Sequence, residues 1–258
     1  MPLYFTKVLS LLFGLIWGSF LNVCIQRIPL GKSLVGPGSS CPKCGAKIRP
    51  YDNIPLLSYL LLLGRCRSCK APISPRYPVV ELLTALLSLA LFLRFGLGAR
   101  YIVSFLFCSA LVVISFIDLD HKIIPDSISL PGILVGVVVS VLGIYSISWL
   151  DSLLGALCGG GFLYLIATVF ERFTGKQGMG GGDIKLMAMI GAWMGWKSLP
   201  FVILISSITG IFMGGAGLLL AGMGYRAKIP FGPFLSLGAL VYFFFGVEIV
   251  GWYIGILS

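Results

Sequence analysis

The chain has 258 residues, of which 58% are hydrophobic and only 11% are charged, and its mean hydropathy is +1.02. Soluble domains carry about 25% charged residues, so this composition excludes an ordinary soluble protein and predicts an integral membrane protein. The formal net charge is +10. Nucleic-acid binding needs a basic face on a soluble module, so we expect no nucleic acid among the partners.

Eight apolar segments are candidates for transmembrane helices, each of which needs about 20 apolar residues. The candidates are residues 4–26, 78–96, 101–118, 126–146, 150–170, 183–197, 199–223 and 231–256. The sixth is the shortest, and the ten-residue apolar stretch 54–63 fits an interfacial or packed helix better than a span. We therefore predict an all-α polytopic membrane protein with about eight transmembrane helices.

The basic residues predict the orientation, because cytoplasmic loops of membrane proteins collect Lys and Arg. Placing the long loop after the first segment in the cytoplasm puts 15 of the 19 basic residues on that side. Both chain ends then face away from the cytoplasm. The same bias predicts contact between the basic loops and anionic lipid headgroups.

Two cysteine pairs lie in the long loop after the first segment. Cys41 and Cys44 belong to "CPKC", and Cys66 and Cys69 belong to "CRSC", with 21 residues between the two pairs. Two such knuckles match a tetrahedral four-thiolate zinc site, and a reducing cytoplasmic loop disfavours disulfides. Four thiolates leave no position for water, so we expect a structural zinc ion. Four unliganded thiols are the alternative.

Two aspartates reach the same membrane boundary from different loops. Asp118 follows the third apolar segment in "FIDLDHKIIPD", and Asp183 ends the glycine-rich stretch "GMGGGD" before the sixth. Two carboxylates held close together do not easily both ionise. The ionised one then activates water, while the protonated one donates to the scissile carbonyl. The pair is therefore a candidate aspartic protease site.

The glycines before Asp183 are candidates for a substrate bed. Glycine permits positive φ and close backbone approach, so we expect Gly180, Gly181 and Gly182 to let a peptide strand lie beside Asp183. Non-helical backbone at membrane depth is tolerated only where it lines a cavity or is buried in protein. The run lacks the G-K-[ST] of a phosphate-binding loop, and no strand precedes it, which argues against nucleotide binding.

Simpler structural roles for these acidic residues stay open. Asp126 follows Pro125 and precedes an apolar run, which is typical of a helix N-cap. Asp183 is also in position to cap the sixth segment. Asp120 is in position either to cap a helix or to pair with Lys122.

Five stretches together resemble one known family. They are "GSFLNVCIQRIP" (18–29), the two cysteine knuckles, "ISPRYPVVELLTA" (73–85), "IDLDHKIIPD" (117–126) and "GMGGGDIKLMA" (178–188). In this order they are similar to the type IV prepilin peptidases, also called leader peptidases, which are membrane aspartic proteases with a Gly-x-Gly-Asp motif. The resemblance covers almost the whole chain.

The resemblance implies a specific activity and site. Asp118 matches the first family aspartate and Asp183 the aspartate of the Gly-x-Gly-Asp motif. The family cleaves the short basic leader, after a glycine, from type IV prepilins or pilin-like secretion subunits at the cytoplasmic face of the bacterial inner membrane. The same proteins usually methylate the new N-terminus with S-adenosylmethionine, an activity that the resemblance attaches to the long cytoplasmic loop.

Three regions are predicted on this basis. They are a first transmembrane helix (1–26), a cytoplasmic loop domain with the four-cysteine site and the methyltransferase region (27–77), and a transmembrane aspartic peptidase domain (78–258). Glu81, near the start of the second segment, is expected to pair with Arg76, or else to hold a substrate or cofactor amine.

Two other function classes are alternatives to a peptidase. An ion-coupled transporter or channel would place functional acidic residues at broken helices near the midplane, whereas here they gather at one face. A membrane scaffold whose zinc loop binds partners would leave the two aspartates unexplained.

Overall fold

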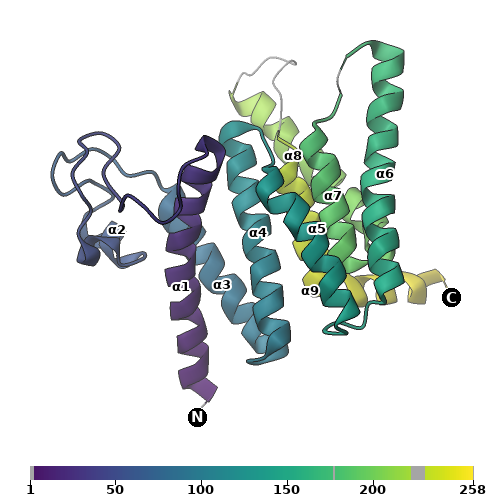
Figure 1. Ribbon diagram of the computed structural model, residues 1–258, viewed down its shortest axis with the longest axis horizontal. Helices are drawn as coiled ribbons and strands as arrows, with labels where there is room; N and C mark the ends of the chain where they lie inside the picture. Colours follow the sequence, from purple (N-terminus) through teal and green to yellow (C-terminus); the bar gives the residue numbers. More distant parts are fainter. Residues whose placement is uncertain (1–2, 177, 222–229, 258) are drawn as a thin grey trace. The chain divides into compact units, whose positions relative to one another are not determined.

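The computed structural model describes residues 3–176, 178–221 and 230–257, and over these residues it is helical and contains no β-strand beyond two isolated bridges (Figure 1). Each of the eight predicted segments coincides with one long helix. These are α1 (Leu3–Arg27), α3 (Arg76–Phe95), α4 (Ala99–His121), α5 (Asp126–Val141), α6 (Trp149–Thr174), α7 (Gly181–Met194), α8 (Leu199–Ala221) and α9 (Gly232–Leu257). The short helix α2 (Leu57–Leu61) lies within the stretch that was expected to be interfacial or packed.

The helices confirm an all-α membrane protein. Within the described residues, five helical stretches are long and apolar enough to cross a bilayer. They are Tyr4–Leu30, Arg76–Phe95, Ala99–His121, Trp149–Thr174 and Trp196–Met213. Asp126–Val141 and Gly232–Gly246 are shorter apolar helices, and α7, the segment expected to be shortest, has 14 residues.

The chain divides into two compact units, Met1–Val113 and Ile114–Ser258. The boundary falls inside α4, so the first unit holds α1 to α3 and the start of α4, and the second holds its end and α5 to α9. The division of the sequence into 1–26, 27–77 and 78–258 by activity stays a prediction.

In the first unit, α1 packs closely against α3 because glycines face the crossing. A Cβ at Gly14 would lie 2.6 Å from the Cα of Ala85, and one at Gly18 would lie 2.7 Å from the Cα of Glu81. Small residues let apolar helices approach at backbone distance, which is a main source of helix association in membranes. Ser88 Oγ, fully buried on α3, donates to the carbonyl of Ser10 at 2.6 Å.

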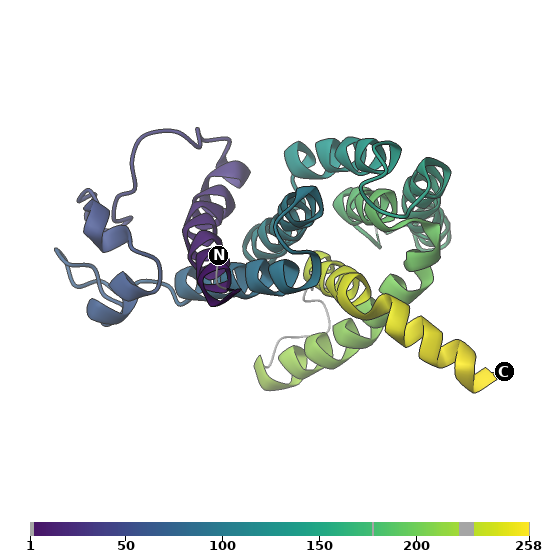
Figure 2. The same cartoon turned by 90° about the horizontal axis from the view of Figure 1, so that it is seen from below.

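In the second unit, α7 packs against both α5 and α6 (Figures 1 and 2). A side chain on Gly155 of α6 would collide with the Gly191 backbone of α7, and one on Gly159 would lie 2.6 Å from the Met187 carbonyl oxygen. The buried Ser152 hydroxyl donates to the Ala192 carbonyl at 2.6 Å. The N-terminal end of α7, which carries Asp183, is therefore held by packing along the helix behind it.

Candidate functional site

The four loop cysteines form one cluster. Their sulfur atoms all lie within 4.8 Å of one another, and Cys41 Sγ is 3.8 Å from Cys69 Sγ. Four thiolates around a tetrahedral zinc at ~2.3 Å would have sulfurs ~3.8 Å apart. The predicted grouping of Cys41, Cys44, Cys66 and Cys69 is confirmed, and the spacing fits a zinc ion.

The two cysteine knuckles repeat one backbone design. In the first, the Gly45 N–H donates to the Cys41 carbonyl at 2.9 Å, and in the second the Lys70 N–H donates to Cys66 at 3.0 Å. Gly45 and Lys70 occupy equivalent positions, with φ of 69° and 58°. Backbone N–H groups turned inward suit a thiolate, and those of Cys44 and Lys43 lower the pKa of Cys41 to about 6.

A salt bridge ties the loop together outside the cysteine cluster. Arg67 Nη2 lies 2.6 Å from Asp52 Oδ1, and its Nε donates to both oxygens of the same carboxylate. The hydrogen bonds from Arg67 lower the pKa of Asp52. Asp52 belongs to the short helix Pro50–Asn53, so the pair connects the segment between the knuckles to the second knuckle.

Asp118 lies near the C-terminal end of α4 with only 5% of its surface exposed. Its Oδ2 accepts the backbone N–H of Gly232 at 2.9 Å. Gly232 is the first residue of α9, and the first N–H groups of a helix have no partner within it and carry partial positive charge. The N-terminus of α9 therefore orients the Asp118 carboxylate.

Asp183 is the third residue of α7 and is half-buried. Its backbone N–H donates to the Gly180 carbonyl at 3.1 Å, and a Cβ on Gly180 would lie 3.4 Å from Asp183 Oδ2. The N-cap of α7 is Gly180. The alternative that Asp183 itself caps this helix is therefore wrong.

Ile124 links the surroundings of the two aspartates. A Cβ on Gly182, next to Asp183, would lie 2.8 Å from Ile124 Cβ. A Cβ on Gly232 would lie 3.2 Å from Ile124 Cδ1 and 2.7 Å from Asp118 Oδ2. The carboxylates are close enough for the charge of Asp118 to act on Asp183. Two loops that were expected to reach the same boundary thus bring their acidic residues together.

Two of the glycines before Asp183 pack closely against neighbouring side chains. None of Gly178, Gly180, Gly181 and Gly182 has a positive φ, so the positive φ that glycine permits is not used there. Gly181 and Gly182 already belong to α7, where glycine leaves room for a neighbour. Gly178 packs against the Phe170 ring, and Gly182 packs against Ile124.

A small cavity lies beside this glycine run. It has a volume of about 200 Å³, and its lining includes Gly180, Gly181, Glu171 and Tyr164. Gly182 is not among the lining residues. A side chain on Gly181 would meet nothing within 4 Å, so open space adjoins the turn that carries Asp183.

Asp126 has a different role from the one expected. It is the first residue of α5, whose N-cap is Pro125. Both of its carboxylate oxygens accept from Lys185 Nζ at 2.7 Å. The N-cap interpretation was therefore wrong, and the carboxylate pairs instead with a cation one turn into α7.

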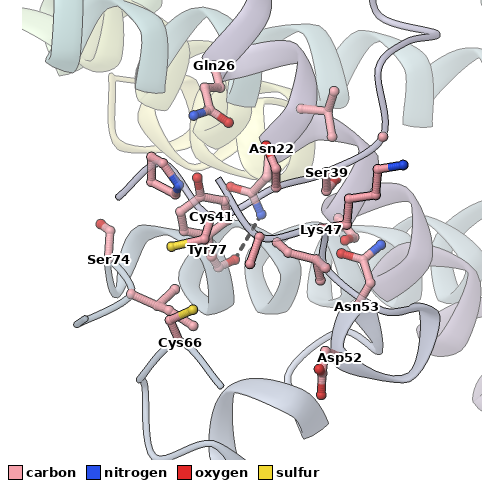
Figure 3. A pocket seen from close by; sticks show the side chains of 18 of the residues that line it. Asn22, Gln26, Ser39, Cys41, Lys47, Asp52, Asn53, Cys66, Ser74 and Tyr77 are labelled. Carbon is pink, nitrogen blue, oxygen red and sulfur yellow. Dashed lines mark hydrogen bonds between the residues drawn. The ribbon is translucent and has the colours of Figure 1, made fainter. Parts of the chain in front are cut away.

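The first unit contains a second and larger cavity, of about 1050 Å³ (Figure 3). Residues of α1, the loop and α3 line it, and Asn22 and Glu81 are buried in its wall. Figure 3 shows Asn22 and Gln26 with the loop residues Ser39, Cys41 and Lys47. Asn22 was not among the predicted site residues, although an asparagine inside an apolar segment is costly and so signals a function.

These features define a polytopic membrane protein with a four-thiol loop and two neighbouring acidic side chains held at helix N-termini. The model of the bacterial peptidase A24 N-terminal domain matches residues 12–95, and that of the type IV leader peptidase family matches residues 105–215. No solved structure matches.

Curated relatives match nearly the full length. The chain is 42% identical to a prepilin leader peptidase/N-methyltransferase of Aeromonas hydrophila, with 98% of this chain and 94% of the relative covered. It is 41% identical, over the same shares, to a protein of that name from Pseudomonas aeruginosa, and 36% identical to one from Burkholderia pseudomallei, over 92% and 84%.

The chain therefore belongs to the type IV leader peptidase family. It is a peptidase, and the apolar helices together with the relatives assign it to the bacterial inner membrane. The resemblance seen in the sequence motifs is confirmed over nearly the whole chain.

Proposed function

We propose that this chain is an aspartic endopeptidase that removes the basic leader from type IV prepilins or pilin-like secretion subunits, with Asp118 and Asp183 as its catalytic pair. The observation that carries the proposal is the placing of these two residues. One carboxylate is buried and held by the α9 N-terminus, and the other lies in the first turn of α7 within range of its charge.

The chemistry follows from two neighbouring carboxylates that share one proton. The ionised carboxylate takes a proton from water, and the water oxygen forms a bond to the scissile carbonyl carbon. The protonated carboxylate donates to the carbonyl oxygen, which gives a neutral tetrahedral intermediate. When the C–N bond breaks, a proton passes to the leaving amine, and the products are the leader acid and the mature N-terminal amine.

The cavity beside α7 supports a substrate bed at Gly180 and Gly181. Both line it, and Gly181 has open space where a side chain would be. An extended peptide on this surface would bring its scissile carbonyl next to Asp183. Gly182, which was grouped with them, supports the bed indirectly, because its missing side chain lets α7 approach Ile124.

The four-cysteine cluster is proposed to hold one structural zinc ion. Cys41, Cys44, Cys66 and Cys69 would be its ligands, and zinc would supply folding free energy to a loop with few apolar residues. Metal analysis of protein purified without added metal should find about one zinc per chain. A metal-free, folded protein would contradict the zinc site.

Methyl transfer to the new N-terminus is the second proposed activity, with S-adenosylmethionine as the donor. It is supported by the name of the relatives and by the cavity of about 1050 Å³ in the first unit. Pockets for small molecules of this kind measure about 300–1,000 Å³. The excess of Lys and Arg in the loop supports a cytoplasmic position for both activities. The same basic residues support contact of the loop with anionic lipid headgroups.

The peptidase proposal is tested with the purified full chain and a prepilin-like substrate that keeps its transmembrane segment. Asp118→Asn and Asp183→Asn should each abolish leader cleavage while the protein still inserts and folds. Asp151→Asn is the matched control, because its carboxylate accepts only a structural hydrogen bond from Trp196 Nε1 at 3.0 Å among the contacts described. Retained cleavage in either of the first two variants would refute the assigned pair.

A further inference from the structure

The large cavity of the first unit contains two buried oxygen acceptors that neither zinc nor the aspartate pair uses. Asn22 of α1 is 2% exposed, and Glu81 of α3 is 8% exposed. Both line the cavity. Polar side chains in apolar helices are expensive, and those that face a cavity mark a binding site by default.

Asn22 offers an unmet acceptor. Its Nδ2 donates to the Tyr77 carbonyl at 3.0 Å, the bond drawn in Figure 3. This bond fixes the side-chain amide, since the reverse orientation would set two oxygens against each other. Asn22 Oδ1 is buried and has no hydrogen-bond partner. A buried acceptor left unsatisfied is unfavourable by about 1–3 kcal/mol, so a donor is expected there.

Glu81 adds a carboxyl group to the same cavity. Its Oε2 accepts the backbone N–H of Leu56 at 2.8 Å, which anchors the side chain to the segment before α2. Its Cα is held against α1, because a Cβ on Gly18 would lie only 2.7 Å away. The carboxylate is therefore fixed in position, and a buried carboxylate is favourable when a cation binds beside it.

Apart from Asp52, the other charged residues of the lining are all basic. It includes Arg27, Lys32, Lys43, Lys47, Arg49, Arg67 and Arg76. Asp52, the other acidic residue of the lining, already forms a bidentate pair with Arg67. The cavity thus combines one buried carboxylate and an amide oxygen with many cations, a pattern that suits a ligand with an ammonium group and a separate anionic group.

We propose that Asn22 and Glu81 bind the α-ammonium group of a ligand in this cavity. An ammonium has three donors and one positive charge, which match an amide oxygen and a carboxylate. A divalent metal is a poorer match for this cavity. In the described part of the chain, only the four cysteines form a group of three or more His, Cys, Asp or Glu side chains that could hold a metal ion.

The assignment rests on the proposed methyl transfer and identifies a subsite for it. Two molecules in that reaction carry an α-amine, namely S-adenosylmethionine and the newly cleaved polypeptide. The shared chemistry is a primary α-ammonium group, and the two sources are separated by experiment.

The test uses the full chain in lipid nanodiscs and ligands that differ by one amine. One pair of probes is S-adenosylhomocysteine and its desamino analogue, which keeps the carboxylate. The other pair is a peptide with the mature N-terminal sequence, with its α-amine either free or acetylated. Calorimetry gives Kd for each probe with the parent protein, Glu81→Gln, Asn22→Ala and the control Glu248→Gln, which changes a carboxylate of α9 in the second unit.

With the parent protein, the probe that carries a free amine should bind at least about tenfold more tightly than the matched probe without it in one of the two pairs. This ratio of Kd values corresponds to ~1.4 kcal/mol. Glu81→Gln and Asn22→Ala should each narrow that difference, and Glu248→Gln should leave it intact. A difference within the nucleoside pair identifies the cofactor as the source, and one within the peptide pair identifies the cleaved substrate.

Equal binding within both pairs by the parent protein would overturn the assignment. The assignment would also be overturned if Glu81→Gln still cleaved the leader and kept the parent's ratio of Kd values within the probe pair. If Glu81→Gln does not fold, the outcome with Asn22→Ala decides by the same criterion. Leader cleavage by the parent protein is measured in parallel, so a failure of the amine site is distinguishable from a failure of the proposed peptidase.

Discussion

Replacing Gly232 by alanine should disturb the proposed chemistry without unfolding the protein. The new Cβ would lie 2.7 Å from Asp118 Oδ2, whereas real Cβ atoms stay at least 3.0 Å from such neighbours. The carboxylate must therefore move by a few tenths of an ångström, and its 2.9 Å bond to the Gly232 N–H must lengthen or bend. Alanine is a better helix former than glycine, so α9 itself should not suffer.

The magnitude follows from the geometry. A hydrogen bond to a charged group contributes about 1.5–3 kcal/mol, and misplacing a reacting group by 1 Å reduces rate about 10²-fold. If Gly232→Ala weakens this hydrogen bond and shifts the carboxylate by part of 1 Å, kcat should fall about 10- to 100-fold. This corresponds to ~1.4–2.7 kcal/mol in the activation barrier. KM should change little, because Gly232 orients the carboxylate and is not expected to touch the substrate.

The assay is steady-state cleavage of a prepilin-like substrate in detergent or nanodiscs. Gly161→Ala is the matched control, since it adds the same methyl group inside α6, where it would meet nothing within 4 Å. The control should retain parent kcat. A Gly232→Ala protein with unchanged kcat would refute the argument that the α9 N-terminus positions Asp118 for catalysis.

Three further predictions follow from packing and charge. Gly45→Ala should destabilise the zinc loop by about 1 kcal/mol, and Lys70→Gly should stabilise it by a similar amount, because both positions have positive φ; competition with a zinc chelator measures both. Gly155→Leu should prevent folding of the second unit or lower its thermal midpoint severely, since its side chain would meet the α7 backbone. Asp52→Asn should lower loop stability at pH 7, measured by hydrogen exchange. Because Arg67 depresses the folded-state pKa of Asp52, the difference from the parent should shrink as pH falls below about 4 through that pKa.

The sequence predicted the helices well because hydropathy is a local property. Every apolar segment became one helix, and most boundaries agree within a few residues, for example 101–118 against Ala99–His121. The four-cysteine cluster was also predictable, because each CxxC knuckle forms its turn from residues that are adjacent in sequence. Cys41 and Cys66 each begin the same short hydrogen-bonded loop, and only the docking of one knuckle on the other depends on the fold.

The tertiary partners of the acidic residues were not predictable. The N–H that orients Asp118 comes from Gly232, 114 positions later, and no local pattern around "IPFGPF" indicates it. Asp126 had the sequence context of an N-cap, but Lys185 from another helix pairs with it. A capping role inferred from local sequence therefore does not show which charged residue of another helix the side chain contacts.

Three buried polar side chains, Asn22, Glu81 and Asp118, share one design. Asn22 is anchored to the Tyr77 carbonyl, Glu81 to the Leu56 N–H and Asp118 to the Gly232 N–H. In each case a backbone group from another element fixes a costly polar group in place, so the side chain is oriented before any ligand arrives. Positioning and chemistry are then separable by mutation. A change at the backbone partner, such as Gly232→Ala, should reduce kcat only partly. Removal of the Asp118 carboxylate should abolish cleavage altogether.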